Sequence, residues 1–389
     1  MIKPRNLFKQ IQPYIDTPEA IIITGIRRAG KTTALQYFYQ QIPSDNKIFL
    51  DLENILNRLY FEEKNYERIK FTFETLGLDF TKKSYIFLDE IQLVKNLPSI
   101  VKYFIDHYKV KFFLTGSASF YLKNLFTESL SGRKYIFEIY PLTFKEFLIF
   151  KEVKLNIPEE SRLVNPQIFD TISRYYDEYI QFGGFPAVVL KSNLEEKKKA
   201  LEEIFSSFFQ LEILQLGDFR RNKVIRDLIL LLIQRIGSKL DIQKLSSELG
   251  ISRPSIYEYI SFLEGTYFIK LVKPFSKKKN AEIRKVPKVY LCDSGLANHF
   301  AKLDQGIVFE NCVFQNLITK GEINYYQKKS GAEIDFILNK EIAYEIKLKS
   351  GEQDLKRLTE FSKKLGLKES YVVSRKYCDL ENILYGFML

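Results

Sequence analysis

The segment from Gly25 to Thr32 reads GIRRAGKT and constrains the fold of this chain more than any other stretch. It matches the pattern G-x-x-x-x-G-K-[ST] without departure, and it lies between a predicted β-strand and a predicted helix. In this setting the glycines let backbone N–H groups surround phosphates, and the helix N-terminus adds partial positive charge. The alternative is a Gly-rich turn without a ligand.

The motif predicts a different role for each of its polar residues. Lys31 is expected to reach the β- and γ-phosphates, and the Thr32 hydroxyl is expected to bind Mg²⁺. The residues of this segment that we expect at the nucleotide are Gly25, Arg28, Ala29, Gly30, Lys31, Thr32 and Thr33. ATP and Mg²⁺ are therefore the predicted ligands.

Further apolar runs predict three more strands, at 48–54, 84–90 and 110–119. Helical patterns, such as the one at 98–108, lie between them. Continuous apolar strands that alternate with helices are typical of a parallel sheet covered by helices on both faces. We therefore expect an α/β domain with a parallel-sheet core over residues 1–150.

Two of these strands end in residues that suit phosphoryl transfer. Asp89 is expected to hold Mg²⁺ through water, and Glu90 is expected to orient or deprotonate the attacking water. Ser117, or alternatively Thr115, is a candidate sensor of the γ-phosphate, and a helix-capping role for Ser117 competes with that function. Arg133 is a candidate for the arginine that neutralises transition-state charge, with a surface salt bridge as the alternative.

The composition of the whole chain limits its partners and metals. The formal net charge of +11 favours polyanionic partners, nucleic acid first. With only two histidines and three cysteines that lack C-x-x-C spacing, any metal is expected to be a hard cation such as Mg²⁺. No apolar run approaches the roughly 18 residues of a membrane span, and the start lacks a signal-peptide core. We expect a cytoplasmic protein without a membrane partner.

The rest of the chain divides into three blocks. Residues 151–222 are mostly helical in pattern. Residues 223–300 predict three helices followed by two strands, which is the composition of a winged helix-turn-helix. Ser252 is the expected N-cap of the third of these helices. Residues 301–389 predict the order helix, strand, strand, strand, helix, strand, with a closing strand near the end.

The winged helix is a candidate reader of duplex DNA. Arg253 and Ser255 lie near the start of its recognition helix, and lysines 277–279 lie at the tip of the wing, where phosphates can be contacted. Glu258 and Glu264 on the same helix would repel DNA. The alternative is therefore a rigid spacer that relays the nucleotide state.

The stretch at 331–349, GAEIDFILNKEIAYEIKLK, predicts a hairpin with acidic residues on both strands. A three-residue loop sets Asp335 opposite Glu345, with Lys347 on the same face. Two carboxylates in this register lie about 5 Å apart at Cβ and can share a hard cation. Upstream, a predicted helix carries Glu310. The alternative is a solvated hairpin in which Lys347 only pairs with the acids.

Several of these motifs together resemble a known family. GIRRAGKT, FLDEIQ, LTGSAS and LSGRKYIFEIYPLTFKEFL (130–148) are similar to prokaryotic AAA-like ATPases, relatives of the STAND group, whose C-terminal half is a domain of unknown function. The resemblance covers essentially the whole chain. It implies an ASCE-type P-loop core, a helical lid, a winged helix and a C-terminal restriction-endonuclease-like domain.

The same resemblance implies roles for further residues. Gly184-Phe185-Pro186 looks like the GxP motif with which STAND lids contact the nucleotide, so Pro186 is a candidate nucleotide contact. A plain Gly-Gly-Pro turn is the alternative. The last block resembles the PD-(D/E)xK nuclease core, which places metal binding on Asp335 and Glu345, with Glu310 assisting, and a catalytic role on Lys347.

Together these observations predict a Mg²⁺-dependent ATPase that switches a DNA-facing, nuclease-like effector half. The alternative is an ATP-controlled interaction scaffold with an inactive nuclease-like domain. Duplex DNA is a candidate partner. A homo-oligomer is a candidate assembly, because arginines such as Arg27 and Arg28 are candidates for contacts with a neighbouring subunit.

Overall fold

The computed structural model describes residues 2–116, 130–214, 222–276, 286–328, 331–380 and 382–389. They form two compact units. The first comprises Met1–Tyr140 with Gly265–Tyr267, and the second comprises Pro141–Glu264 with Phe268–Leu389. Within the described ranges, no helix is both long enough and apolar enough to cross a membrane.

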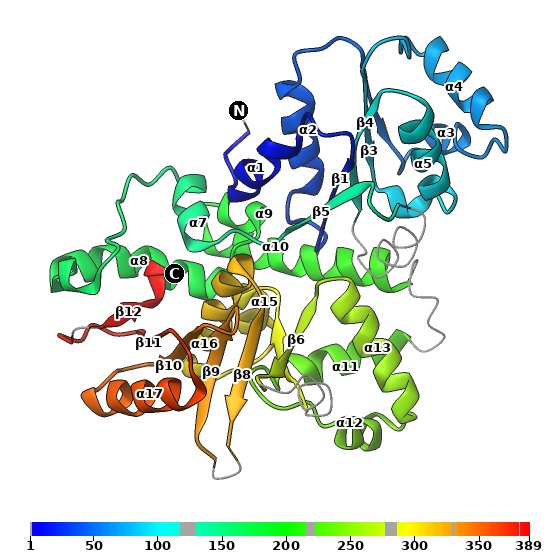
Figure 1. The fold of residues 1–389 in the computed structure, drawn as a ribbon. Helices are drawn as coiled ribbons and strands as arrows, with labels where there is room; N and C mark the ends of the chain where they lie inside the picture. Colours follow the sequence, from blue (N-terminus) through cyan, green and yellow to red (C-terminus); the bar gives the residue numbers. More distant parts are fainter. Residues whose placement is uncertain (1, 117–129, 215–221, 277–285, 329–330, 381) are drawn as a thin grey trace. The chain divides into compact units, whose positions relative to one another are not determined.

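The first unit is built on a five-stranded sheet in which all neighbouring strands run parallel (Figure 1). In spatial order the strands are β2 (Lys47–Asp51), β3 (Ser84–Asp89), β4 (Val110–Gly116), β1 (Ala20–Gly25) and β5 (Lys134–Ile139). Four of them match the strands predicted from the apolar runs. β5 is a fifth that those patterns did not reveal, because most of its residues are only partly buried.

Helices connect these strands and cover the sheet. Among the described residues of this unit the α-helices are α1 (Asn6–Ile11), α2 (Lys31–Gln41), α3 (Ile55–Leu59), α4 (Tyr66–Thr75) and α5 (Leu97–His107). In α5, Leu97, Val101 and Phe104 recur at helical spacing and are fully buried. They pack into one core with residues of β3 and β4, as expected for an amphipathic helix on a sheet.

The second unit begins with a helical region. Its helices up to residue 265 are α7 (Phe144–Phe150), α8 (Pro166–Phe182), α9 (Pro186–Val189), α10 (Leu194–Ser207), the π-helix Phe208–Leu214, α11 (Asn222–Ile233), α12 (Ile242–Leu249) and α13 (Arg253–Gly265). Short polar residues begin many of them. Thr143 and Glu146 form a capping box on α7, and the Ser252 side chain accepts a hydrogen bond from Ser255 N–H as predicted.

A seven-stranded mixed sheet forms the rest of the second unit (Figure 1). Its spatial order is β12 (Ile383–Tyr385), β11 (Glu369–Ser374), β10 (Ile342–Lys347), β9 (Glu333–Leu338), β8 (Ile323–Gln327), β6 (Ile269–Pro274) and β7 (Lys288–Leu291). The associated helices are α15 (Ser294–Phe300), α16 (Gln305–Leu317) and α17 (Glu352–Leu365). The order of elements after residue 301 matches the predicted one.

The region expected to form a winged helix has its predicted elements but not a separate sheet. α11, α12, α13 and the antiparallel pair β6 and β7 are present. β6 also pairs in parallel with β8, so both strands belong to the seven-stranded sheet. Lysines 277–279 lie outside the described residues. A DNA-reading winged helix therefore stays a prediction.

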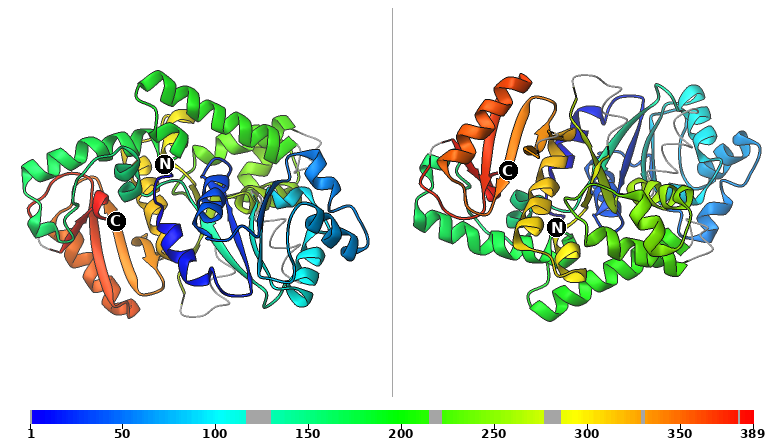
Figure 2. Two further views of the ribbon diagram at one scale, coloured as in Figure 1. Left: turned by 90° about the horizontal axis from the view of Figure 1, so that it is seen from above. Right: turned by 90° about the horizontal axis from the view of Figure 1, so that it is seen from below.

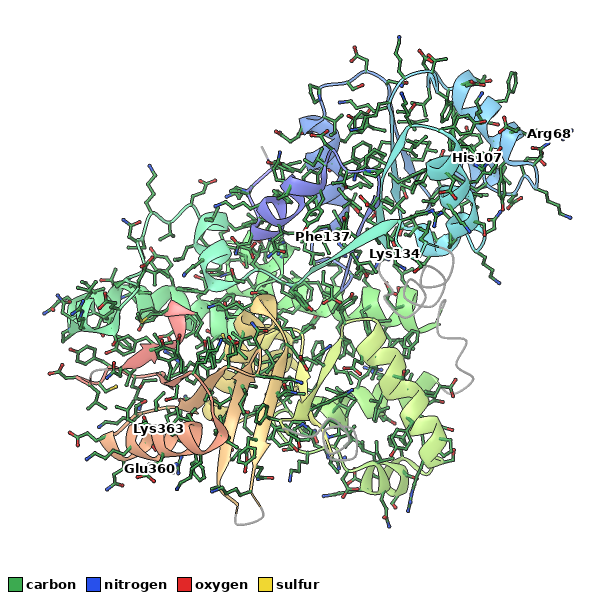
Figure 3. The ribbon with its side chains drawn as sticks, in the orientation of Figure 1. Arg68, His107, Lys134, Phe137, Glu360 and Lys363 are labelled. Atoms are coloured by element: carbon green, nitrogen blue, oxygen red, sulfur yellow. The ribbon has the colours of Figure 1, made fainter. Side chains whose placement is uncertain are left out.

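α17 packs along β10 and β11 in this sheet (Figure 2). Its exposed side carries Glu360 and Lys363, which Figure 3 labels. Leu358 and Ser362 on its other side are buried. α17 therefore covers one face of β10 and β11, and its Arg357 pairs with Glu345 of β10.

Candidate functional site

The P-loop connects β1 to α2 and brings two strands into close contact. Gly25 ends β1, and Lys31 begins α2. A Cβ added at Gly25 would lie 2.0 Å from the carbonyl oxygen of Ile139 in β5, so only glycine fits at this position. Thr32 and Thr33 follow in the first turn of α2 and are exposed, which leaves both side chains accessible to a ligand.

Lys31 lies inside the loop that the motif assigns to phosphates. The residue is 5% exposed, and its Nζ donates to the carbonyl oxygens of Gly25 at 3.0 Å and Ile26 at 3.1 Å. A buried ammonium is costly unless its donors are satisfied. The two loop carbonyls accept hydrogen bonds from two of its three N–H donors and hold the positive charge where the motif predicts phosphate.

Asp89 ends β3 and meets two hydroxyl groups. Thr115 in β4 and Thr32 in α2 both donate hydrogen bonds to its carboxylate. Burial raises the pKa of Asp89, and the two hydroxyl groups act in the opposite direction. A buried carboxylate beside the Thr32 hydroxyl is an oxygen donor set that suits Mg²⁺, so these residues fit the predicted metal.

Glu90 follows Asp89 in a left-handed backbone conformation, with φ of 54°. Its carboxylate accepts a hydrogen bond of 2.5 Å from Gln92 Nε2, and Arg27 Nη1 lies 3.7 Å from its Oε1 atom. Arg27 also pairs with Glu53 at 2.9 Å. Glu90 thus lies beside the P-loop and is held by Gln92, a contact that no sequence pattern indicated, and its catalytic role stays a prediction.

Of the two residues predicted to sense the γ-phosphate, Thr115 and Ser117, the structure describes only Thr115. Thr115, the second choice from the sequence, lies at the end of β4 and contacts Asp89. Ser117, the first choice, lies outside the described residues. Its expected contact with the γ-phosphate stays a prediction.

Arg133 lies at the end of the parallel sheet opposite to the P-loop of the same chain. It precedes Lys134, the first residue of β5, which Figure 3 labels. In the parallel register Lys134 pairs with Ala20 at the start of β1, whereas the P-loop follows Gly25 at its end. At about 3.3 Å per residue this separation is roughly 17 Å. Arg133 instead pairs with Asp106 at 2.6 Å. In the structure this pair is partly exposed, and a catalytic role for Arg133 stays a prediction.

Pro186 belongs to the second unit and begins α9. The glycines before it are packed against Asp293. A Cβ at Gly183, whose φ is 76°, would lie 2.0 Å from Asp293 Oδ1, and Gly184 N–H donates to Asp293 Oδ2 at 2.7 Å. Burial raises the pKa of Asp293 to about 6. This packing explains the glycines without a ligand, and the nucleotide contact of Pro186 stays a prediction.

The predicted hairpin has the loop length that sets its two acids opposite each other. Residues 339–341 join β9 to β10, and the printed pairs place Phe336 opposite Tyr344. The same register sets Asp335 opposite Glu345. The Asp335 carboxylate accepts a hydrogen bond of 2.7 Å from Ile346 N–H, and burial, together with nearby Glu310 and Glu345, raises its pKa to about 7.

The carboxylates of this cluster already have partners within the protein. Glu345 pairs with Lys347 at 2.9 Å and with Arg357 of α17. Glu310 in α16 accepts a hydrogen bond of 2.5 Å from Tyr290, and burial raises its pKa. Within the described parts of the chain, no three His, Cys, Asp or Glu side chains are arranged to hold one metal ion. The cluster therefore does not fit a three-carboxylate metal site in this arrangement.

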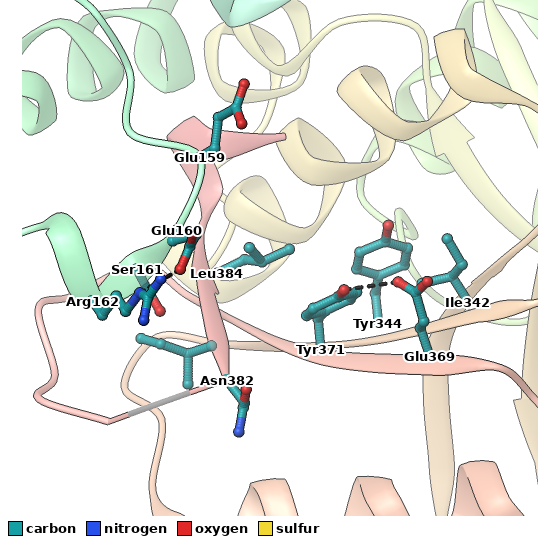
Figure 4. Close-up of a pocket in the computed structure, with 11 residues that line it drawn as sticks. Glu159, Glu160, Ser161, Arg162, Ile342, Tyr344, Glu369, Tyr371, Asn382 and Leu384 are labelled. Carbon is teal, nitrogen blue, oxygen red and sulfur yellow. Dashed lines mark hydrogen bonds and ion pairs between the residues drawn. The ribbon is translucent and has the colours of Figure 1, made fainter.

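A separate cleft of about 570 Å³ lies at the β10–β12 edge of the second unit (Figure 4). Tyr344 and Tyr371 stack with ring centroids 6.0 Å apart and line it. Two of the acidic side chains at the cleft have partners: Tyr371 donates to Glu369, and Arg162 pairs with Glu160. None of the residues predicted from the sequence as site residues lines this cleft.

Comparison with known proteins agrees with the geometry of the first unit. Residues 17–148 match the family described as AAA domain. Residues 173–306 match a domain of unknown function, DUF8612, and residues 305–382 match another, DUF4143. The first unit thus contains a P-loop AAA-type ATPase domain, and the remainder carries two domains without an assigned function.

Two uncharacterized proteins match this chain over most of its length, and one solved structure is similar to it. An uncharacterized protein of Haemophilus influenzae is 28% identical over 91% of this chain and 90% of its own length. The Walker-type ATPase PABY2304 of Pyrococcus abyssi matches with a TM-score of 0.47 and 16% identity, over 77% of this chain and 96% of that chain. The uncharacterized protein MJ1544 of Methanocaldococcus jannaschii is 31% identical over 89% of this chain and 79% of its own length. This chain belongs to the same family as MJ1544, and its N-terminal part is an AAA domain.

Proposed function

We propose that the first unit binds ATP with Mg²⁺ and hydrolyses it, and that the nucleotide state switches the second unit. The observation that carries this proposal is the meeting of Thr32 and Thr115 on the Asp89 carboxylate. This contact joins the P-loop helix to the C-terminal ends of β3 and β4. Buried Lys31 lies at the same end of the sheet. The AAA domain match over the same residues supports it.

In this proposal each side chain has one task. Lys31 places its positive charge at the β- and γ-phosphates, and Thr32 with Asp89 holds Mg²⁺. The metal, when bound, neutralises phosphate charge that develops during transfer. Glu90, held by Gln92 and facing Arg27, orients the attacking water or accepts its proton.

Two variants separate binding from hydrolysis. Lys31→Ala is expected to abolish ATP binding in isothermal titration, because it removes the charge inside the loop. Glu90→Gln is expected to keep binding and lose hydrolysis. Lys64→Ala and Glu62→Gln change exposed residues of the same unit and serve as matched controls. Undiminished ATP affinity in Lys31→Ala would overturn the assignment.

For the second unit we propose an effector role controlled by this ATPase, in one of two forms. In the first, a nuclease of the PD-(D/E)xK kind uses Asp335, Glu345 and Lys347, and duplex DNA is its substrate. The register of β9 and β10 supports it. In the second, the unit is an interaction scaffold. The pairing of Glu345 with Lys347 and Arg357 supports that form.

Supercoiled plasmid distinguishes the two forms. Scission that requires Mg²⁺ or Mn²⁺ and disappears in Asp335→Ala, while ATP hydrolysis persists, would establish the nuclease. If the plasmid stays intact while the protein hydrolyses ATP, the interaction scaffold is the form that remains. Because Asp335 and Lys31 lie in different units, loss of cleavage alone does not reflect a damaged ATPase.

A further inference from the structure

Arg5 lies against the P-loop although it is remote from it in sequence. Its side chain is buried, with 8% of the residue exposed. Nη1 donates to the carbonyl oxygen of Ala29 at 3.0 Å, and Nη2 donates to the carbonyl oxygen of Tyr140 at 2.8 Å. Arg5 Nη1 is also the heavy atom nearest to a Cβ added at Gly30, at 3.7 Å. One guanidinium thus joins the P-loop to Tyr140, the last residue of the first unit's N-terminal segment.

The segment that carries Arg5 is anchored on the helix that follows the P-loop. Leu7, Phe8 and Ile11 of α1 are buried. The Phe8 ring stacks on Tyr37 of α2 with centroids 4.0 Å apart and meets Phe38 edge-on at 5.7 Å. Because α1 is fixed to α2 by these rings, the position of Arg5 relative to the loop is fixed as well.

The bond to Ala29 determines where the next amide points. In a trans peptide the C=O and the following N–H point in opposite directions. An Ala29 carbonyl turned toward Arg5 therefore turns the Gly30 N–H away from it. Gly30 N–H belongs to the loop that the motif assigns to phosphate contacts. Arg5 can thus hold that donor in one orientation before the nucleotide arrives.

We propose that Arg5 is a positioning residue of the nucleotide site: it orients the Gly30 amide and ties the P-loop to the end of β5. The inference rests on the proposed ATPase function. Tyr140 directly precedes Pro141, the first residue of the second unit. A shift of the Ala29 carbonyl on nucleotide binding therefore reaches the start of the second unit through a single side chain.

The test compares Arg5→Lys with Lys9→Ala, which removes an exposed charge from α1, the helix that follows Arg5. A lysine keeps the charge but lacks the planar fork that reaches two carbonyls at once. We expect Arg5→Lys to raise the Kd for a non-hydrolysable ATP analogue about tenfold, the size of one charge-assisted hydrogen bond. Lys9→Ala should bind as the parent does. Guanidinium ion at millimolar concentration should restore affinity to Arg5→Ala but not to Lys31→Ala.

Hydrogen exchange supplies a second readout that a purely structural role would not change. In the parent, the analogue should alter exchange over residues 142–150, and in Arg5→Lys this response should be lost. If Arg5→Lys binds the analogue as the parent does while Lys31→Ala does not, the Arg5 inference fails and the ATPase stands. If Lys31→Ala also binds normally, the ATPase assignment fails. A folded state of Arg5→Lys that melts below the assay temperature would assign Arg5 to folding and overturn the proposal.

Discussion

The Thr115 hydroxyl donates a hydrogen bond to the Asp89 carboxylate, across the neighbouring parallel strands β4 and β3. Both residues are buried. The bond keeps Asp89 more acidic than burial alone would allow, because it favours the ionised carboxylate. An ionised Asp89 is what binding of Mg²⁺ requires in the proposed ATPase.

Thr115→Val should therefore weaken the proposed metal site without disturbing the core, since the two side chains have similar shapes. Loss of the donor raises the pKa of Asp89 further, so the acidic limb of the pH–rate profile for ATP hydrolysis should move to higher pH. The Mg²⁺ concentration for half-maximal rate should rise about tenfold, which corresponds to roughly 1.4 kcal/mol.

Thr24→Val is the matched control for this experiment. Thr24 is a buried threonine near the end of β1, and its Oγ1 has no hydrogen-bond partner among the described residues. Replacing it should leave the pH–rate profile unchanged and should not reduce stability. Equal profiles for Thr115→Val and the parent would remove Thr115 from the site.

Arg133→Ala should leave ATP affinity and turnover unchanged in dilute protein, because Arg133 lies at the opposite end of β5 from the P-loop. Loss of its pair with Asp106 should cost no more than about 1 kcal/mol, since both side chains are partly exposed. Arg133 could still act on the nucleotide of a neighbouring subunit, and turnover measured against protein concentration tests that role. A rise with concentration in the parent that is absent in Arg133→Ala would indicate action on a neighbouring subunit.

Duplex DNA binding, where it occurs, is expected to depend on lysines 277–279. Their replacement with alanine should flatten the salt dependence of binding by up to about three phosphate contacts. Alanine at Lys363, Lys364 and Lys376, which are exposed in the same unit, removes equal charge elsewhere. Identical slopes for all three proteins would leave the predicted winged helix as a relay.

The features predicted correctly from the sequence are those encoded in short local patterns. The P-loop, four strands of the first unit and the three-residue loop of the β9–β10 hairpin each follow from residues close together in the chain. β5 was missed: its apolar run of three residues is followed by Glu138, and most of its residues are only partly buried. The position of Arg133 depends on how β5 pairs with β1, which no local pattern contains.

The contacts that decide the chemistry come from remote segments, and no local pattern contains them. Arg5 reaches Ala29 across 24 residues and Tyr140 across 135. Lys288 of β7 pairs with Glu333 of β9, and Arg357 of α17 pairs with Glu345. The predicted register of the hairpin sets Asp335 opposite Glu345, as in the structure. The partners of these two acids, however, depend on tertiary packing. These partners decide whether the acids hold a metal or a salt bridge.

Asp335 provides the pH-dependent test of that question. Its pKa is about 7 in the folded protein, against an ordinary value of 3.8, so the folded state binds more protons than the unfolded state between those pH values. The contribution of Asp335 to the free energy of unfolding should therefore be largest at low pH, and it should fall as pH rises from about 4 to 7. The upper limit is about 1.4 kcal/mol for each pH unit in that window.

Asp335→Asn removes the ionisation but keeps an oxygen that can accept the Ile346 N–H. Urea unfolding as a function of pH should show a shallower slope between pH 4 and 7 for this variant, and greater stability than the parent at pH 8. A bound metal would make the parent more stable than Asp335→Asn at pH 8, because the metal stabilises the ionised carboxylate. With the charges of Glu345 already paired by Lys347 and Arg357, we expect Mn²⁺ at pH 8 to leave both proteins unchanged. Stabilisation of the parent alone by Mn²⁺ would contradict this expectation and favour the nuclease.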